Sequence, residues 1–205
     1  MNRIILASQS PRRKSLLERM DVGPFETIPS GFEEVLDDTR DVNDIAKELA
    51  LGKALEVALR FPEAIVVASD TIVAIGTRQL GKAGDIDEAR EMLIDLSTGP
   101  SSVVTGVAVV QGETQLVDVD VTKVFFKPNS PEVQAAREAY LESGDWEDKA
   151  GAYGIQDPAA ILLFDHIDGD YDTIVGLPTK LLAGMLNEFG IHASPVIYQS
   201  PVPQQ

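Results

Sequence analysis

The sequence feature that most limits the fold is the run AIVVASDTIVAI at residues 64–75. Apolar residues occupy most positions of this run, so a strand formed by it would be apolar on both faces. Such strands lie in the middle of a sheet that is covered on both sides, as in α/β proteins. Strand-like and helix-like patterns alternate along the rest of the chain, which has no internal repeat. We therefore predict an α/β fold with this run as a central strand.

The remaining patterns place the other elements of this sheet and its helices. We expect strands at residues 3–7, 25–29, 102–110, 115–126 and 160–164, and helices at residues 11–20, 41–60, 86–96, 131–141 and from 178 onward. The two strands around Gly112 predict an antiparallel hairpin, so the sheet is mixed. The length of 205 residues fits one domain, residues 1–192, with two lobes around a cleft. Residues 193–205 are rich in proline and glutamine, and we expect this tail to be disordered at its end.

The charge balance and the residue types exclude several functional classes. The chain carries 17 Lys and Arg against 33 Asp and Glu, a formal net charge of -16, which disfavours nucleic-acid polymers and anionic membranes as partners. It has no cysteine, so disulfides, thiolate metal sites and cysteine nucleophiles are excluded. The apolar runs are shorter than the ~18–20 residues that cross a bilayer, and the N-terminus does not resemble a signal peptide. We expect a soluble, intracellular protein.

A carboxylate interrupts the central apolar run. Asp70 lies between Ser69 and Thr71 in the expected buried strand. A buried ionised carboxylate is unfavourable unless it is paired or bound to a metal. Asp70 is therefore a candidate general base or Mg²⁺ ligand, and a purely structural carboxylate is an equally good explanation. Glu33 and Glu34 offer further oxygen ligands for a hard cation, and their alternative interpretation is a charged surface loop.

Basic residues gather at the start of the first expected helix. Arg12, Arg13 and Lys14 fall in its first turn, where the helix dipole is already positive. At ~100° per residue, Arg13 points inward with the apolar side chains of this helix. With the free N–H groups after Ser8, this turn predicts a phosphate cradle. The alternative is a solvated basic turn in which only the stem of Arg13 packs.

Three lysines complete the set of candidate cations. Lys53 lies on the apolar stripe of the helix expected at residues 41–60, where a lysine either meets an anion or extends to solvent. Lys82 (in GKAG) and Lys149 (in KAGAYGIQ) stand among small residues, which let a backbone approach a ligand closely. Their alternative interpretation is two exposed lysines in turns.

Other motifs add little to this set of residues. The aspartates at residues 165–172 lack the spacing of a calcium loop, and we interpret them as a solvated turn. The chain has no nucleophile elbow for a Ser–His–Asp triad, no Walker A motif and no Rossmann glycine motif. The cations and carboxylates together predict a phosphate-bearing small molecule as ligand, with a divalent metal.

Several segments, in their order along the chain, resemble the Maf family of septum-formation-inhibitor-like nucleotide pyrophosphatases. The matching segments are LASQSPRR (6–13), ASDTIV (68–73), GK (81–82), TGV (105–107), DKAGAYGIQ (148–156) and GDYDTIVGLP (169–178). The resemblance implies an elongated, mixed central sheet flanked by helices, similar to the inosine-triphosphate pyrophosphatase-like fold. It also implies a cytoplasmic homodimer that hydrolyses nucleoside triphosphates to monophosphate and pyrophosphate with a divalent cation, Mg²⁺, Mn²⁺ or Co²⁺.

The same resemblance assigns roles to individual residues. Asp70 matches the aspartate that acts as proton acceptor. The implied catalytic residues are Asp70, Lys82 and Lys53, the implied substrate-binding residues are Ser8, Arg12, Arg13, Thr71, Lys149 and Gln156, and the implied metal ligands are Glu33 and Asp70. The chain departs from the family pattern at Ala83, at Ser101 and Ser102, and at Asp157, where proline, histidine and glycine, respectively, are usual.

The segment KAGAYGIQ also bears on the choice of nucleobase. It resembles the branch that acts on dTTP and UTP, whereas the 7-methyl-GTP branch typically lacks this lysine and carries an acid at the position of Gln156. A glutamine amide can accept from a pyrimidine N3–H and donate to O4, which makes this division chemically reasonable. We expect a dTTP/UTP pyrophosphatase. The alternatives are a pyrophosphatase for modified purine nucleotides such as 7-methyl-GTP, or a non-catalytic, nucleotide-sensing regulator of septum formation.

Overall fold

The computed structural model describes residues 3–33, 37, 39–197 and 200–204, and its centre is a mixed β-sheet. Within these ranges the sheet has seven strands: β1 (Ile4–Leu6), β2 (Phe25–Thr27), β3 (Ile65–Ile75), β4 (Arg78–Leu80), β5 (Ser101–Gln111), β6 (Thr114–Phe126) and β7 (Phe164–Asp168). Their order is β2-β1-β3-β5-β6-β7, and β4 pairs with the end of β3. β1 is parallel to β2 and β3, and the other pairs are antiparallel. The mixed α/β fold and the central position of β3 are confirmed.

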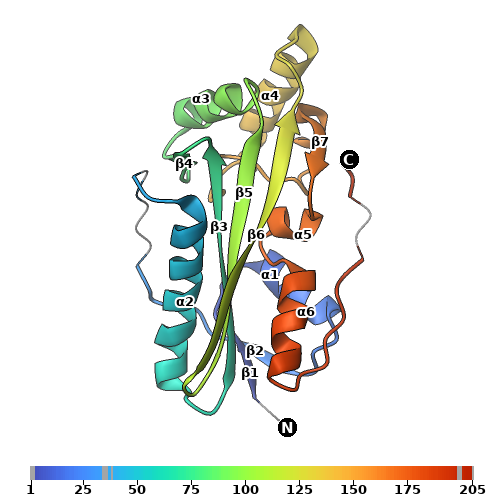
Figure 1. Cartoon of the computed structure of the whole chain (residues 1–205). Coiled ribbons are helices and arrows are strands. Elements are labelled where there is room, and N and C mark those ends of the chain that lie inside the picture. The colour runs from blue at the N-terminus through green and yellow to red at the C-terminus, as the bar shows by residue number, and fades with distance from the viewer. Residues whose placement is uncertain (1–2, 34–36, 38, 198–199, 205) are drawn as a thin grey trace.

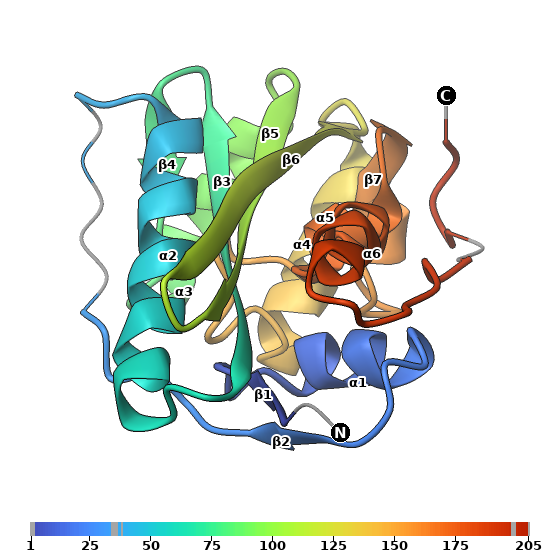
Figure 2. The same cartoon turned by 60° about the horizontal axis from the view of Figure 1, so that its bottom comes forward.

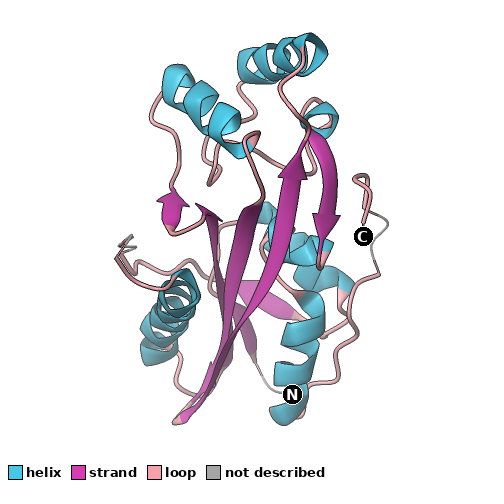
Figure 3. Cartoon of the chain, turned by 45° about the horizontal axis from the view of Figure 1, so that its top comes forward, coloured by secondary structure: helices cyan, strands magenta, loops and turns pink. Residues whose placement is uncertain are grey.

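Helices flank this sheet on both faces. They are α1 (Pro11–Arg19), α2 (Val42–Arg60), α3 (Ile86–Leu96), α4 (Pro131–Ser143), α5 (Tyr171–Val175) and α6 (Thr179–Glu188). The long strands β3, β5 and β6 run side by side, with α2 along one face and α1 and α6 on the other (Figure 1, Figure 2). Helices α3 and α4 lie together at one end of the sheet (Figure 3), so the molecule is elongated along its strands. None of the helices in the described ranges combines the length and apolar character that crossing a membrane requires.

Local sequence signals set where the helices begin. Ser10, Asp41, Asp85 and Ser130 each accept a hydrogen bond from a backbone N–H in the first turn of α1, α2, α3 and α4. These side chains satisfy donors that have no partner inside the helix. The predicted starts of these helices are therefore confirmed.

Small residues let α2 press closely against the sheet. Alanines of α2, β3 and β5 share one buried cluster on this face. Gly106 of β5 marks the tightest contact, because a Cβ at this position would overlap the backbone of α2 at Ala46. Gly106 is also the register partner of Asp70 on β3. The close approach of α2 therefore occurs next to the acidic residue of the central strand.

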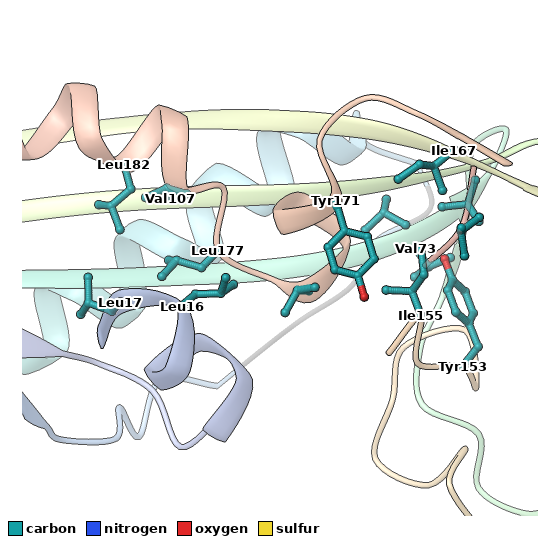
Figure 4. Close-up of a cluster of buried hydrophobic side chains, with 14 of the residues drawn as sticks. Leu16, Leu17, Val73, Val107, Tyr153, Ile155, Ile167, Tyr171, Leu177 and Leu182 are labelled. Atoms are coloured by element: carbon teal, nitrogen blue, oxygen red, sulfur yellow. The ribbon is translucent and has the colours of Figure 1, made fainter. Parts of the chain in front are cut away.

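The opposite face of the sheet carries the larger hydrophobic core. Leu16 and Leu17 of α1 lie near Leu177, which precedes α6, in one part of this cluster (Figure 4). Val73 of β3 and Ile155 belong to the same cluster at its other end (Figure 4). The core thus connects α1, the central strand and the segment that contains Ile155.

Three short elements differ from the sequence prediction. The prediction of a strand at residues 160–164 is wrong, because Ile161–Leu163 forms a 3₁₀ helix and the strand is β7. The exposed Asp165 and Asp168 of β7 have the composition of a turn, which hides the strand pattern. β4 and α5 are not predicted at all, since three and five residues are too few for a clear period.

Parts of the C-terminal tail pack against the rest of the chain. In residues 200–204, Val202 is 2% exposed and Ile167 N donates to Pro203 O at 2.9 Å. Closer to α6, Val196 N donates to Thr179 Oγ1 at 2.9 Å. Residues 198–199 and 205 of the tail lie outside the described residues. The tail is therefore attached by the burial of Val202 and by these two hydrogen bonds, which involve its backbone. The disorder expected at the end of the tail stays a prediction.

Candidate active site

A gap along one edge of β3 gives access to the central strand. On this edge β3 pairs with β1 as far as Val67 and with β4 from Val73 onward. Residues 68–72 have no strand neighbour there within the described chain, although β5 pairs with all of them on the other edge. Asp70 and Thr71 lie in this gap. In open α/β sheets ligands bind in the crevice beyond the carboxyl ends of parallel strands, and this gap lies just beyond the end of β1 at Leu6.

A cleft of about 610 Å³ opens at the gap and brings together most of the candidate residues. Its lining includes Ser8, Arg12, Arg13, Lys53, Asp70, Thr71, Lys82, Lys149 and Gln156. These side chains come from the turn before α1, from α1 itself, from α2, from β3 and from two glycine-rich segments. The volume lies in the range typical of small-molecule sites. Glu33 is not part of the described lining, although its neighbour Phe32 is.

An ion pair occupies the wall formed by β3 and α2. Lys53 Nζ lies 2.5 Å from Asp70 Oδ1, and the two side chains are 11% and 8% exposed. Lys53 belongs to the face of α2 that covers the sheet, as its apolar stripe predicts. The anion that the position of Lys53 requires is therefore Asp70. Because both residues line the cleft, a water molecule or a cation in the cleft can reach the carboxylate.

A second network holds the opposite side of β3. Arg13 donates from Nη2 to Thr71 Oγ1 at 3.0 Å and from Nε to Gly176 O at 2.9 Å. Ser69 donates to the same carbonyl at 2.8 Å, and the hydroxyls of Thr71 and Thr105 are 3.0 Å apart. Arg13 thus points inward, as its helical position predicts, and connects α1 to β3 and α5. Its guanidinium forms part of the cleft wall.

The turn before α1 presents groups that suit an anion. Ser8 Oγ accepts from Ser10 N at 3.1 Å, and Ser10 Oγ accepts from Arg13 N at 3.4 Å. Arg12 is exposed at the cleft, and the first turn of α1 has no acidic residue. The positive end of the helix dipole and the arginine together favour a phosphate group at this place.

Two lysines enter the cleft from glycine-rich segments that lie side by side. Lys82 forms an isolated antiparallel bridge with Ala150, and Gly151 N donates to Gly81 O at 2.9 Å. The Lys82 ammonium is 3.4 Å from Asp148 in a largely exposed pair. In contrast, the Lys149 side chain is only 14% exposed. Lys82 is therefore a solvent-facing cation, and Lys149 is held inside the wall.

Tyr140 and Asp157 are not among the site residues expected from the sequence, yet both support the segment with Lys149 and Gln156. Tyr140 of α4 is buried and bonds to Asp157, which lines the cleft beside Gln156. Burial and the nearby charge of Asp157 raise the pKa of Tyr140, so its hydroxyl remains a neutral donor. The departure from the family pattern at Asp157 is the one signal in the sequence that points to this contact.

The protein supplies few carboxylates for a metal. Glu33 is exposed near the cleft, and Glu34 lies outside the described residues. Among the residues that are described, no group of three or more His, Asp or Glu side chains could hold a metal ion. A cation bound at Asp70 would therefore need further oxygen ligands from the substrate or from water. Mg²⁺ often binds in this way, with one or two carboxylates and the phosphates of a nucleotide.

Comparisons with known proteins cover almost the whole chain. The family model described as Maf-like protein matches residues 3–189. A protein from Shouchella clausii named dTTP/UTP pyrophosphatase is 44% identical over 192 residues, covering 94% of this chain and 98% of that protein. A protein of the same name from Pyrococcus furiosus is 41% identical over 188 residues, covering 91% and 95%. Another from Symbiobacterium thermophilum is 43% identical over 190 residues, covering 93% and 95%.

Proposed function

The chain belongs to the family of Maf-like proteins, and from this premise we propose that it hydrolyses dTTP and UTP to the nucleoside monophosphate and pyrophosphate. The observation that carries the proposal is the buried Lys53–Asp70 pair in a cleft lined by further cations. A chain with a net charge of -16 has no general attraction for polyanions. The convergence of its basic side chains at one cleft therefore favours a single compact polyanion such as a triphosphate.

Asp70 is the group best placed to accept a proton from water. It lies in the cleft, 5% exposed, and Lys53 fixes the orientation of its carboxylate. In the proposed step, Asp70 takes a proton from a water molecule whose oxygen attacks the α-phosphorus. The bond between the α-phosphorus and the bridging oxygen breaks, and pyrophosphate leaves with the electron pair.

The cations that line the cleft come from separate parts of the chain. Arg12 and the turn at Ser8 provide donors at the start of α1, and Lys82 provides a solvent-facing charge at the glycine-rich segments. We propose that these groups bind the triphosphate and offset the charge on the departing pyrophosphate. Arg13 acts from the wall, where it holds Thr71 in place.

The residues present fit a divalent cation of the Mg²⁺ type. The nearby candidate ligands, Asp70 and Glu33, are oxygen donors, which is the ligand chemistry that Mg²⁺ and Mn²⁺ prefer. We propose that these two carboxylates hold the metal together with substrate phosphates. When bound, the metal would neutralise phosphate charge and align the phosphate oxygens.

Base recognition is assigned to the end of the cleft that contains Gln156. Its side chain is exposed there, and an amide can accept from N3–H and donate to O4 of thymine or uracil. Thr71, whose hydroxyl bonds to Arg13 and Thr105, supports the adjoining wall. With its carbonyl oxygen toward N3–H and its NH2 group toward O4, this amide would favour thymine and uracil over cytosine, which has an acceptor at N3 and a donor at N4.

A nucleotide panel tests the proposal directly. The purified protein is incubated with Mg²⁺ or Mn²⁺ and dTTP, UTP, dCTP, GTP or 7-methyl-GTP, and pyrophosphate and orthophosphate are measured separately. We expect pyrophosphate release, fastest with dTTP and UTP. Orthophosphate as the first product would contradict attack at the α-phosphorus. A preference for 7-methyl-GTP would favour the purine alternative, and tight nucleotide binding without turnover would favour a regulatory sensor.

We extend the proposal to a homodimer in the cytoplasm, as the family resemblance implies. Neither property is needed for the chemistry described above, because every residue of that scheme lies on one chain. Light scattering coupled to size-exclusion chromatography measures the mass in solution, and the 22.1 kDa chain should elute at about twice that mass. A monomeric mass at micromolar concentration would contradict the dimer and leave the proposed reaction unaffected.

A further inference from the structure

An ion pair joins the two ends of the loop at residues 149–157. Lys149 Nζ lies 3.2 Å from Asp157 Oδ2, and the side chains are 14% and 20% exposed. Lys149 also donates to the backbone carbonyl of Asp145. Gly154 lies directly beneath the pair, because a Cβ at this position would approach Lys149 Cε to 2.8 Å and would also meet the Asp157 carboxylate. Side chains, rather than regular secondary structure, therefore close this loop.

A buried tyrosine connects the ion pair to α4. Tyr140 is 0% exposed, donates from its hydroxyl to Asp157 Oδ2 at 2.9 Å and accepts from Gly154 N at 3.1 Å. One hydroxyl group thus holds the loop at two points. Tyr140 lies behind the described lining of the cleft, so it affects a bound nucleotide only through the loop.

Gln156 stands between two fixed neighbours. Ile155 is 3% exposed in the core that includes Val73, and Asp157 is held by Tyr140 and Lys149. The side chain of Gln156 itself is exposed at the cleft. With the backbone fixed on both sides, the directions open to this amide are limited. Direction matters because an amide distinguishes bases by which of its ends donates and which accepts.

We propose that Tyr140 and Asp157 are positioning residues that set the nucleobase selectivity of the cleft by orienting Gln156 and Lys149. The inference rests on the proposed function and adds to it the residues that orient the side chain that recognises the base. Asp157 acts through its neighbours, because its Oδ2 is shared between Tyr140 and Lys149. Loss of one member gives the loop several conformations, which weakens discrimination between bases more than it slows the chemistry at Asp70.

Two substitutions each remove one part of this network. Tyr140→Phe deletes the hydroxyl, and Asp157→Asn keeps the size of the side chain and removes its charge. We measure kcat and KM with dTTP and with dCTP. In both variants KM for dTTP should rise, and the dTTP-to-dCTP ratio of kcat/KM should fall about five- to tenfold, as expected for one lost hydrogen bond. The value of kcat for dTTP should stay close to that of the wild type.

A substitution at Asp145, the other partner of Lys149, provides a matched control. Asp145→Asn changes an acid near the loop and leaves in place the backbone carbonyl that accepts from Lys149. This variant should keep the wild-type ratio. The double variant Tyr140→Phe/Asp157→Asn should lower the ratio little further than the larger single effect, because both residues act through one network.

The dTTP-to-dCTP ratio of kcat/KM shows whether Tyr140 and Asp157 position Gln156 or only stabilise the fold. A smaller folded fraction lowers the apparent kcat for both nucleotides equally and changes neither KM nor the ratio. Folded variants that keep the wild-type ratio overturn the inference. If Tyr140→Phe fails to fold, Asp157→Asn still provides the comparison, because its side chain is partly exposed.

Binding of the nucleoside monophosphates separates this inference from the proposed hydrolysis. Calorimetric titration with dTMP and dCMP measures base preference without turnover. If the wild type prefers dTMP but releases no pyrophosphate, and the variants lose the preference, the positioning role stands and the hydrolysis proposal fails. If the wild type hydrolyses dTTP and the variants keep its preference in both measurements, only the positioning role fails. A wild type without any preference contradicts it as well.

Discussion

The two walls of the cleft achieve their geometry in different ways. The strand wall, formed by β3 and α2, holds Asp70 and Lys53 on regular secondary structure. The loop wall, residues 149–157, consists of turns and one isolated bridge. Its shape depends on Tyr140 and on the Lys149–Asp157 pair. One wall is therefore specified by backbone hydrogen bonds and the other by a few side chains.

The two walls suit two different requirements of an enzyme, precise placement of the reacting group and recognition of the substrate. Asp70 lies within a continuous register between β3 and β5, so it cannot shift without breaking backbone hydrogen bonds. Such rigidity suits a proton acceptor, for which a small displacement greatly slows the reaction. The loop wall can change through single substitutions while the sheet stays intact, which suits recognition of different bases. We therefore expect substitutions in the strand wall to change rate or stability, and substitutions in the loop wall to change selectivity.

Asp70→Asn should give the largest effect. The amide can still accept from Lys53 but cannot take a proton from water, so kcat should fall about 10²–10⁴-fold with the preference among bases unchanged. Pyrophosphate release measures the loss, and thermal unfolding verifies the fold. Asp118→Asn, at an exposed position on β6, is the matched control and should behave like the wild type. Near-normal turnover would exclude Asp70 as proton acceptor, and altered base preference would break the division between the walls.

Gly106→Ala and Gly154→Ala sharpen the comparison, because Gly106 of β5 packs against α2 of the strand wall and Gly154 belongs to the loop wall. A Cβ at Gly106 would overlap the backbone of α2 at Ala46, which can yield only if the helix moves. A Cβ at Gly154 would meet the side chains of Lys149 and Asp157, which can rotate. Gly106→Ala should lower the free energy of unfolding by about 2–3 kcal/mol, and Gly154→Ala by less than about 1 kcal/mol. Urea denaturation and the dTTP-to-dCTP ratio measure both effects, and only Gly154→Ala should change the ratio.

The strand wall can largely be predicted from the sequence because its elements repeat. The apolar run around Asp70 and the helical stripe that contains Lys53 each indicate which way a side chain points. Both residues are therefore identified as charges that need a partner. That they are each other's partner is not predicted, because residue spacing does not say which helix covers which strand.

The side-chain directions in the loop wall cannot be predicted in the same way, because an irregular segment has no repeating pattern. Lys149 enters as a candidate cation because the small residues around it indicate a close approach of the backbone, whereas Gln156 enters only through the family resemblance. The contact with Tyr140 depends on how α4 packs, which local sequence does not encode. Asp172 is a similar case, since the expected solvated turn contrasts with a side chain that is 6% exposed and bonded to Thr179.

Gln156→Glu tests the loop wall alone. A carboxylate accepts hydrogen bonds and cannot donate to O4 of a pyrimidine, whereas it suits the N–H donors of guanine. The ratio of kcat/KM for dTTP to that for 7-methyl-GTP should fall about tenfold or more. The melting temperature should change little, because position 156 is exposed. An unchanged ratio would show that Gln156 does not read the base, and a large loss of stability would show that the loop wall is part of the core.

The smallest expected effect concerns α5, which supports the strand wall from behind through the Gly176 carbonyl bonded to Ser69 and Arg13. Burial raises the pKa of Asp172 in α5 above the usual range of a carboxyl group. The folded chain therefore keeps this proton to higher pH than the unfolded chain, so stability falls as pH rises from the usual aspartate pKa to the raised value. Asp172→Asn cannot titrate.

As the pH rises above the usual aspartate pKa, the Asp172→Asn variant should accordingly lose less stability than the wild type, with its dTTP-to-dCTP ratio unchanged. Urea denaturation at several pH values measures the difference between the two proteins. Parallel curves would assign the pH dependence to other groups. A changed ratio would instead show that the loop wall responds to packing behind the strand wall, and the two walls would then have to be treated as one unit.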